Sequence, residues 1–159
     1  MIRCLRFVGD ADDFRDVIRR IDDGRAATLE EFRLGERGEH FGCERGVRVQ
    51  SLFDALPRLR HLELWRSRPD FTDVQALRLE RLLVDPIWGG AAVLASLGRA
   101  NCPALKSLTI ALDDSATGLP RPFLDAQGLG SIERVTLDAA ASGSAQPIEN
   151  PLSFRAAQI

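Results

Sequence analysis

The chain has 159 residues and a formal net charge of −2, with 45% hydrophobic and 28% charged residues. This length fits one domain that is able to bury a core of its own. The near-neutral charge argues against a general binder of nucleic acid or of anionic membranes, since both functions need an excess of basic residues. All but one of the 21 basic residues are arginine, which indicates a GC-rich bacterial genome rather than an anion site.

The cysteines and the apolar runs indicate the compartment. Cys4, Cys43 and Cys102 are odd in number and widely spaced, which favours reduced thiols over a disulfide framework. The apolar residues near the amino terminus are too few for a signal-peptide core, and no run reaches the roughly 18 apolar residues of a membrane span. We therefore expect a cytoplasmic protein that has no membrane partner.

One pattern recurs along the chain: an apolar residue is followed by two more at offsets of three and five. Its six copies are Ile2/Leu5/Phe7, Leu29/Phe32/Leu34, Leu59/Leu62/Leu64, Leu79/Leu82/Val84, Leu105/Leu108/Ile110 and Ile132/Val135/Leu137. The last two apolar residues of each copy alternate with polar ones, which is typical of a half-buried strand. The intervals suit the crossovers that parallel strands need, so the pattern predicts stacked repeats that share one core.

The local patterns predict the following elements in chain order. Strands are expected at Ile2–Val8, Thr28–Leu34, Leu59–Trp65, Leu79–Val84, Leu105–Leu112 and Ile132–Leu137. A helix is expected between Asp10 and Gly24, followed by a short helical turn at Ser51–Leu56, a clear helix at Ala91–Ala100 and one turn near Phe123–Ala126. We expect brief strand pairing at Val47 and Val49, and a non-helical crossover at 66–76. In the tail, Leu152, Phe154 and Ile159 are placed to fold back as a cap over an edge strand, unless the tail is flexible.

The segments LPRLRHLEL (56–64) and CPALKSLTI (102–110) resemble leucine-rich repeat proteins, and the resemblance covers residues 1–140. It implies an α/β fold, a short leucine-rich-repeat solenoid with a curved parallel sheet of about six strands backed by irregular helices and loops. Residues 141–159 then form a C-terminal tail or cap. The family usually has Asn or Cys eight residues after the first apolar position, where it bonds the turn backbone. This chain has Asp10, Arg37, Ser67, Ile87, Asp113 and Ala140 there, so we expect irregular turns.

Strand alternation also predicts a binding surface. If Leu62 and Leu64 point into the core, then His61, Glu63 and Trp65 point outward onto the open, concave sheet. The same rule applied to the neighbouring strands gives a protein-binding site of Arg33, His61, Glu63, Trp65, Arg81, Leu83 and Asp85. An aromatic anchor ringed by arginine and carboxylates is typical of an interface hot spot. The alternative for Trp65 is ordinary packing beneath the 66–76 segment.

The expected function is therefore that of a non-catalytic module that binds an unidentified protein partner and uses no cofactor and no metal. A small hydrolase-like or thiol enzyme is the alternative, using the 35–46 loop with His40, Cys43 or His61. Glu39, His40, Cys43 and Glu44 also offer metal ligands in that loop, although its glycine-rich composition favours a solvated loop. Cys102 is expected to pack in the core. A repeat protein without any selected ligand is the third possibility.

Overall fold

The computed structural model describes residues 4–7, 28–35, 47–86, 89–112, 119–130, 132–139 and 148–149. In chain order the elements are β1 (Cys4–Phe7), β2 (Glu31–Leu34), β3 (Val47–Arg48), α3 (Gln50–Ala55), β4 (His61–Trp65), β5 (Pro69–Asp70), β6 (Arg81–Asp85), α4 (Gly90–Leu97), β7 (Ser107–Leu112), α5 (Arg121–Leu124), β8 (Arg134–Ala139) and β9 (Ile148–Glu149). The helix expected at 10–24, most of the 35–46 loop and the expected cap residues Leu152, Phe154 and Ile159 lie outside the described residues.

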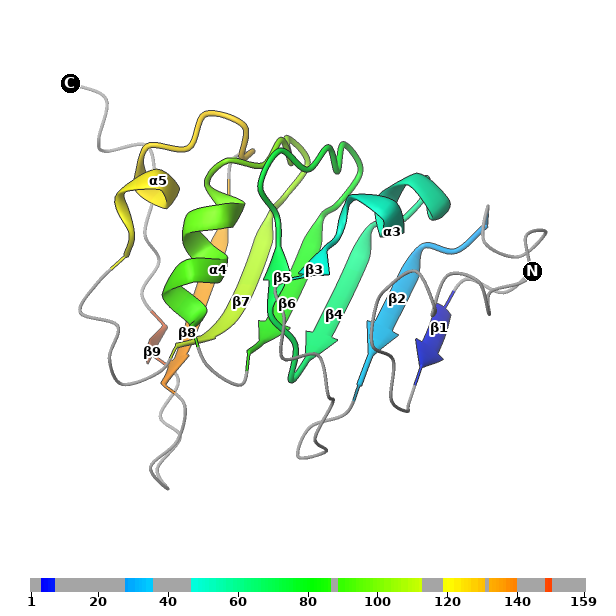
Figure 1. The fold of residues 1–159 in the computed structure, drawn as a ribbon, viewed down its shortest axis with the longest axis horizontal. Helices are drawn as coiled ribbons and strands as arrows, with labels where there is room; N and C mark the ends of the chain where they lie inside the picture. The colour runs from blue at the N-terminus through cyan, green and yellow to red at the C-terminus, as the bar shows by residue number, and fades with distance from the viewer. Residues whose placement is uncertain are drawn as a thin grey trace.

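One large sheet organises the described part of the chain (Figure 1). Strands β1, β2, β4, β6, β7 and β8 are parallel and lie side by side in the order in which the chain reaches them. The tail contributes β9, which pairs antiparallel with β8. The expectation of an α/β protein with six parallel strands is confirmed.

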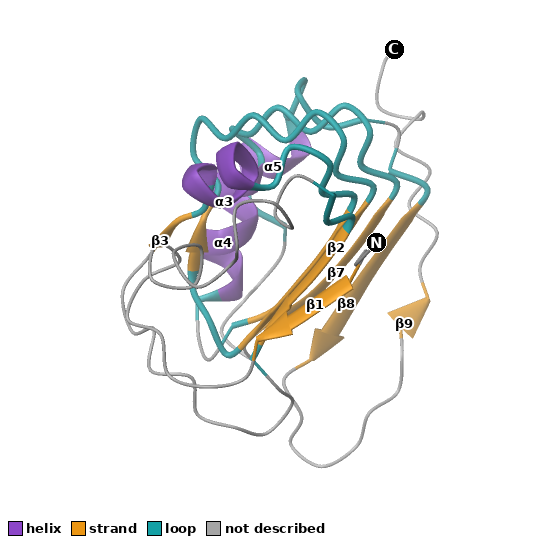
Figure 2. Ribbon diagram, turned by 90° about the vertical axis from the view of Figure 1, so that its right-hand side faces the viewer, coloured by secondary structure: helices purple, strands orange, loops and turns teal. Residues whose placement is uncertain are grey.

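The elements form two layers around the core (Figure 2). Helices α3, α4 and α5 lie on one face of the sheet, whereas the other face carries no helix from the described residues. The 66–76 crossover is non-helical, as expected, and it contains β5, which pairs in parallel with β3 to form a second, two-stranded sheet. Among the described residues, no helix is both long enough and apolar enough to cross a membrane.

Each observed strand in the middle of the sheet begins two residues later than expected, because the first apolar residue of each repeat belongs to a turn. The amide of Leu59 donates to the carbonyl of Leu56 at 3.0 Å, closing this turn before β4. The same bond recurs from Leu79 to Ala76 at 3.2 Å and from Leu105 to Cys102 at 3.1 Å. Apolar spacing alone does not separate a turn from a strand.

A second bonding pattern fixes the register where the strands begin. The carbonyl of Glu30 accepts hydrogen bonds from the amides of Arg60 and His61, at 2.8 and 3.0 Å. The carbonyl of Arg60 accepts in the same way from Glu80 and Arg81, and the pattern repeats at the next two steps, through the carbonyls of Glu80 and Lys106. Successive repeats are therefore held in one register over four strand-to-strand steps.

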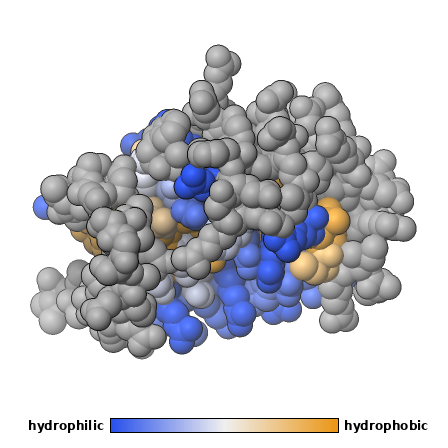
Figure 3. Space-filling model, turned by 90° about the horizontal axis from the view of Figure 1, so that it is seen from below, coloured by the Kyte–Doolittle hydropathy of each residue, from blue (hydrophilic) through white to orange (hydrophobic). Residues whose placement is uncertain are grey.

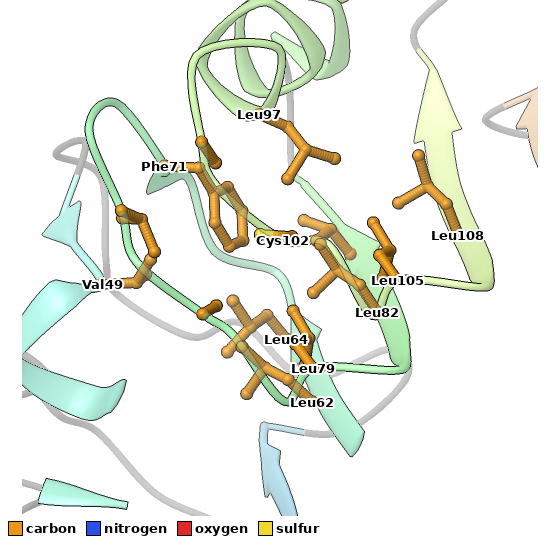
Figure 4. Close-up of a cluster of buried hydrophobic side chains, with 14 of the residues drawn as sticks. Val49, Leu62, Leu64, Phe71, Leu79, Leu82, Leu97, Cys102, Leu105 and Leu108 are labelled. Atoms are coloured by element: carbon orange, nitrogen blue, oxygen red, sulfur yellow. The ribbon is translucent and has the colours of Figure 1, made fainter. Parts of the chain in front are cut away.

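The core lies between the sheet and the helices (Figure 4). The second and third apolar residues of the copies on β2, β4, β6 and β7 point into it, and Leu62, Leu64, Leu82 and Leu108 are at most 2% exposed. Phe71 closes the core from the other layer and is fully buried. Because full burial of each such side chain contributes roughly 1.5–3 kcal/mol, the apolar repeat pattern is the main source of stability.

At one turn, the residue that stands in place of the family's Asn or Cys does not form the side-chain bond to the turn backbone that the resemblance implied. Ser67 stands eight residues after Leu59, where the family has Asn or Cys, and it is 2% exposed. Its Oγ has no hydrogen-bond partner in the described part of the chain. The preceding residue, Arg66, has a positive φ of 55°, and its amide donates to the carbonyl of Asp85 at 2.6 Å. A backbone bond therefore joins the two neighbouring strand ends at this turn.

Candidate functional site

The open face of the sheet carries two rows of outward-pointing residues. The backbone register aligns Cys4, Glu31, His61, Arg81, Ser107 and Arg134 in the first row, and Arg6, Arg33, Glu63, Leu83, Thr109 and Thr136 in the second row. These residues are exposed or half-buried, whereas the residues between them, such as Leu62 and Leu82, are buried. The predicted alternation between the two faces is thus present in the folded chain.

A hollow of about 230 Å³ lies in the middle of this face, across β2, β4, β6 and β7. The outward side chains that line it are Glu31, Arg33, His61, Glu63, Arg81, Leu83, Ser107 and Thr109. Pockets for whole small ligands usually have volumes of about 300–1,000 Å³. The hollow is smaller than this range.

The structure brings five of the seven predicted site residues to the hollow and leaves two beyond it. Arg33, His61, Glu63, Arg81 and Leu83 line the hollow. Sequence reasoning left Glu31, Ser107 and Thr109 out of the site, although they line the same hollow; Arg134 stands on the same face outside the hollow. The side chains of Ser107 and Thr109 are small and carry no signal of a binding site in the sequence, and the structure shows that they line the hollow with Arg81 and Leu83.

Trp65 and Asp85 do not line the hollow, and they face each other at the carboxyl ends of β4 and β6. Trp65 is half-buried and is not among the partly buried apolar side chains that pack against the core. On its other side stands Gly35, whose φ is +80°. A Cβ at Gly35 would lie 2.9 Å from the carbonyl oxygen of Trp65, so the close approach of the two chains requires glycine.

The charges on the β2 and β4 part of the face are paired. Nδ1 of His61 lies 3.2 Å from Oε1 of Glu31, and Nε of Arg33 lies 3.3 Å from Oε2 of Glu63. The hydrogen bond from His61 lowers the pKa of the Glu31 carboxyl below its ordinary value. Since these pairs are partly exposed, each contributes at most about 1 kcal/mol to folding. The Arg33–Glu63 pair balances one positive and one negative charge on this half of the face.

On β6, β7 and β8 the first row holds two arginines and no carboxylate. Arg81 and Arg134 are both exposed, and among the described residues neither has an ion-pair partner. Ser107 lies between them in the first row, and Leu83 lies beside Arg81 in the hollow. The first row therefore presents two guanidinium groups without an ion-pair partner among the described residues, and one of them, that of Arg81, lies beside Leu83 in the hollow.

The thiols of the described residues are poorly suited to nucleophilic chemistry. Cys102 is fully buried, and this burial raises its pKa to about 12, so the expectation that it packs in the core is confirmed. Cys4 is exposed, and partial desolvation, together with a hydrogen bond to Glu31, raises its pKa as well. A raised pKa leaves little of the reactive thiolate at neutral pH.

Metal binding and the alternative enzyme site depend largely on the 35–46 loop. Glu39, His40, Cys43 and Glu44 lie outside the described residues. Within the ranges that are described, no three His, Cys, Asp or Glu residues come together as a metal site.

The geometry of the site supports binding through a shallow surface with an apolar centre and a charged rim. Figure 3 views the molecule from below and shows mainly hydrophilic side chains among the described residues along its lower margin.

Comparison of the chain with family models, with curated proteins and with solved structures finds no match.

Proposed function

We propose that this chain is a short solenoid of the leucine-rich-repeat kind that serves as a non-catalytic protein-interaction module. Two features support the solenoid. The bonding of one carbonyl to two successive amides repeats at four strand-to-strand steps, and the turn bond before the strand repeats in three units. Each repeat contacts mainly its sequence neighbours in the sheet, as expected for stacked repeats.

The proposed binding surface is the interaction face, defined as the residues around the hollow (Arg33, His61, Glu63, Arg81 and Leu83) with Trp65 and Asp85 at its carboxyl end. The observation that carries the proposal is the hollow itself, which places the half-buried Leu83 among charged and hydroxyl side chains from four strands. An apolar centre with a polar rim is the usual anatomy of a protein interface. A few central side chains then supply most of the binding energy.

The alternative thiol enzyme has less support from the described residues. His61 and Cys4 both contact Glu31, but they lie on opposite sides of it in the first row. Two strand spacings, about 9.6 Å, therefore separate the backbone of Cys4 from that of His61. A nucleophile and its base need to lie within hydrogen-bond reach of each other.

The test compares two leucines that differ in their position. Leu83 lies in the hollow, whereas Leu77 is 59% exposed and lies away from the interaction face. We expect Leu83→Ser to reduce capture of a partner from the native lysate by at least about tenfold, because truncating a central interface residue costs roughly 1–2 kcal/mol. The matched control Leu77→Ser should capture the partner as well as the wild type does, as measured by quantitative mass spectrometry of the bound fraction.

Thermal melting of the three proteins separates binding from folding. The proposal requires that Leu83→Ser melt within about 2 °C of the wild type, because its side chain lies outside the buried core. A partner captured equally by both variants would contradict the interaction face. A loss of capture would also contradict it if Leu83→Ser melted at a clearly lower temperature, because unfolding would then explain the loss.

A further inference from the structure

Two arginines of the open face indicate the chemistry of the partner: Arg81, which belongs to the interaction face, and Arg134, which lies beyond the hollow. Arg81 and Arg134 occupy the first row on β6 and β8, and Ser107 on β7 lies between them. Neither guanidinium has an ion-pair partner among the described residues. Two strand spacings put their backbones about 9.6 Å apart, close enough for one short peptide to reach both side chains.

The other residues of the face add to this difference in charge between its two halves. The carboxylate of Glu63 is paired with Arg33, and that of Glu31 lies 3.2 Å from the ring of His61, so neither forms an ion pair with Arg81 or Arg134. Leu83 stands two residues along β6 from Arg81 and therefore points to the same face. The complementary ligand has negative charge over the first row and an apolar side chain over the second row.

We infer that the partner docks through an acidic peptide segment in which carboxylates flank an apolar side chain, a conclusion that rests on the proposed binding function. The carboxylates bind Arg81 and Arg134, and the hydroxyl of Ser107 donates a further hydrogen bond. The apolar side chain packs on Leu83 in the hollow. Arginine suits this role because its planar guanidinium donates two parallel hydrogen bonds to one carboxylate.

The experiment selects peptides from a phage-displayed library of random dodecamers on the immobilised full-length chain. Three proteins are used: the wild type, the charge-reversed variant Arg81→Glu/Arg134→Glu, and the matched control Arg99→Glu/Arg121→Glu. Arg99 and Arg121 are also exposed arginines without an ion-pair partner among the described residues, but they lie by α4 and α5, on the helical layer. The control therefore carries the same net charge as the charge-reversed variant.

We expect the wild type and the control to enrich peptides with two or more acidic residues near an apolar residue, and the charge-reversed variant to enrich basic ones. The best acidic peptide is then synthesised with a fluorescent label. In fluorescence polarisation the charge reversal should raise its Kd by about 100-fold, since each hydrogen bond to a charged group contributes roughly tenfold or more. The control double variant should leave the Kd within about threefold of the wild type.

Other outcomes separate the two proposals. Enriched peptides that are not acidic but lose binding with Leu83→Ser overturn the acidic partner and leave the interaction face in place. Peptides that bind all variants equally, or a failure to enrich any peptide, overturn both proposals. Binding of a labelled RNA oligonucleotide that depends on Arg81 and Arg134 also overturns the proposal of an acidic peptide partner, because the two guanidinium groups would then bind phosphates.

Discussion

At the scale of single residues, two serines show how differently similar hydroxyls are used. Ser96 on α4 donates to the carbonyl of Val93 at 2.8 Å and accepts from the amide of Phe71 at 3.1 Å. It thereby joins the helical layer to the chain segment that closes the core. Ser67 is 2% exposed, and none of the described residues forms a hydrogen bond with its Oγ. A buried hydroxyl without a partner costs roughly 1–3 kcal/mol.

Alanine substitutions at these serines should therefore shift stability in opposite directions. We expect Ser67→Ala to raise the free energy of unfolding by about 1 kcal/mol, because it removes an unsatisfied polar group. Ser96→Ala should lower it by about 1–2 kcal/mol, because the Phe71 amide loses its acceptor. Urea titrations monitored by circular dichroism measure both changes. A loss of stability in Ser67→Ala would show that this hydroxyl has a partner in solution.

At the scale of elements, the helical layer depends on a close approach between α4 and α5. Gly98 follows the last residue of α4 and has an ordinary helical φ of −60°. A Cβ at this position would lie 2.1 Å from the carbonyl oxygen of Pro122 in α5. Glycine is therefore needed here because of the neighbouring backbone and not because of its own conformation.

This distinction predicts whether replacing Gly98 with alanine raises or lowers the stability of the protein. In an open helical position, replacing glycine with alanine stabilises by up to about 1 kcal/mol. At Gly98 we expect alanine to destabilise instead, by about 1–3 kcal/mol, because overpacking forces α4 and α5 apart. Thermal melting measures the change, and the exposed Ala92→Gly on α4 gives the effect of helix propensity alone. A higher melting temperature for Gly98→Ala would mean that the two helices separate without cost.

At the scale of the whole molecule, charges alternate along the edge where the strands begin. The residues just before five successive strands are Glu30, Arg60, Glu80, Lys106 and Glu133. Of these, Arg60 and Glu80 are in contact at 2.6 Å, which lowers the pKa of the Glu80 carboxyl. Each charge thus has opposite charges on the neighbouring strands. The alternation favours this strand order over arrangements that bring like charges together.

Reversing the only lysine tests this charge ladder. Lys106→Glu places a carboxylate between Glu80 and Glu133, and like charges on neighbouring strands each destabilise by roughly 0.2–1 kcal/mol. We expect the urea midpoint to fall at about 0.05 M NaCl and to recover most of the loss at about 0.5 M NaCl, where the charges are screened. Lys106→Arg should match the wild type at both salt concentrations. A loss that persists in high salt would point to packing of the lysine stem instead.

Much of the fold was predictable because burial follows the local pattern of the sequence. The repeated apolar triplets, such as Leu59/Leu62/Leu64, predicted the six parallel strands and which side chains enter the core. The short strands β5 and β9 were not predictable, since two-residue strands exist only through their distant partners. In the three copies that begin at Leu59, Leu79 and Leu105, the first apolar residue closes a turn, and the spacing of apolar residues does not distinguish that turn from a strand.

For the candidate site, the sequence by itself determined which residues leave the core, because side chains alternate along every strand. Only the tertiary structure decided which of them meet. Hydrogen bonds between strands 20 to 30 residues apart in the chain set the register, and that register pairs Glu31 with His61 and Arg33 with Glu63. It also leaves Arg81 without an ion-pair partner among the described residues, beside Leu83 in the hollow. Neither the pairing nor the unpaired charge can be derived from local sequence, because both arise between repeats.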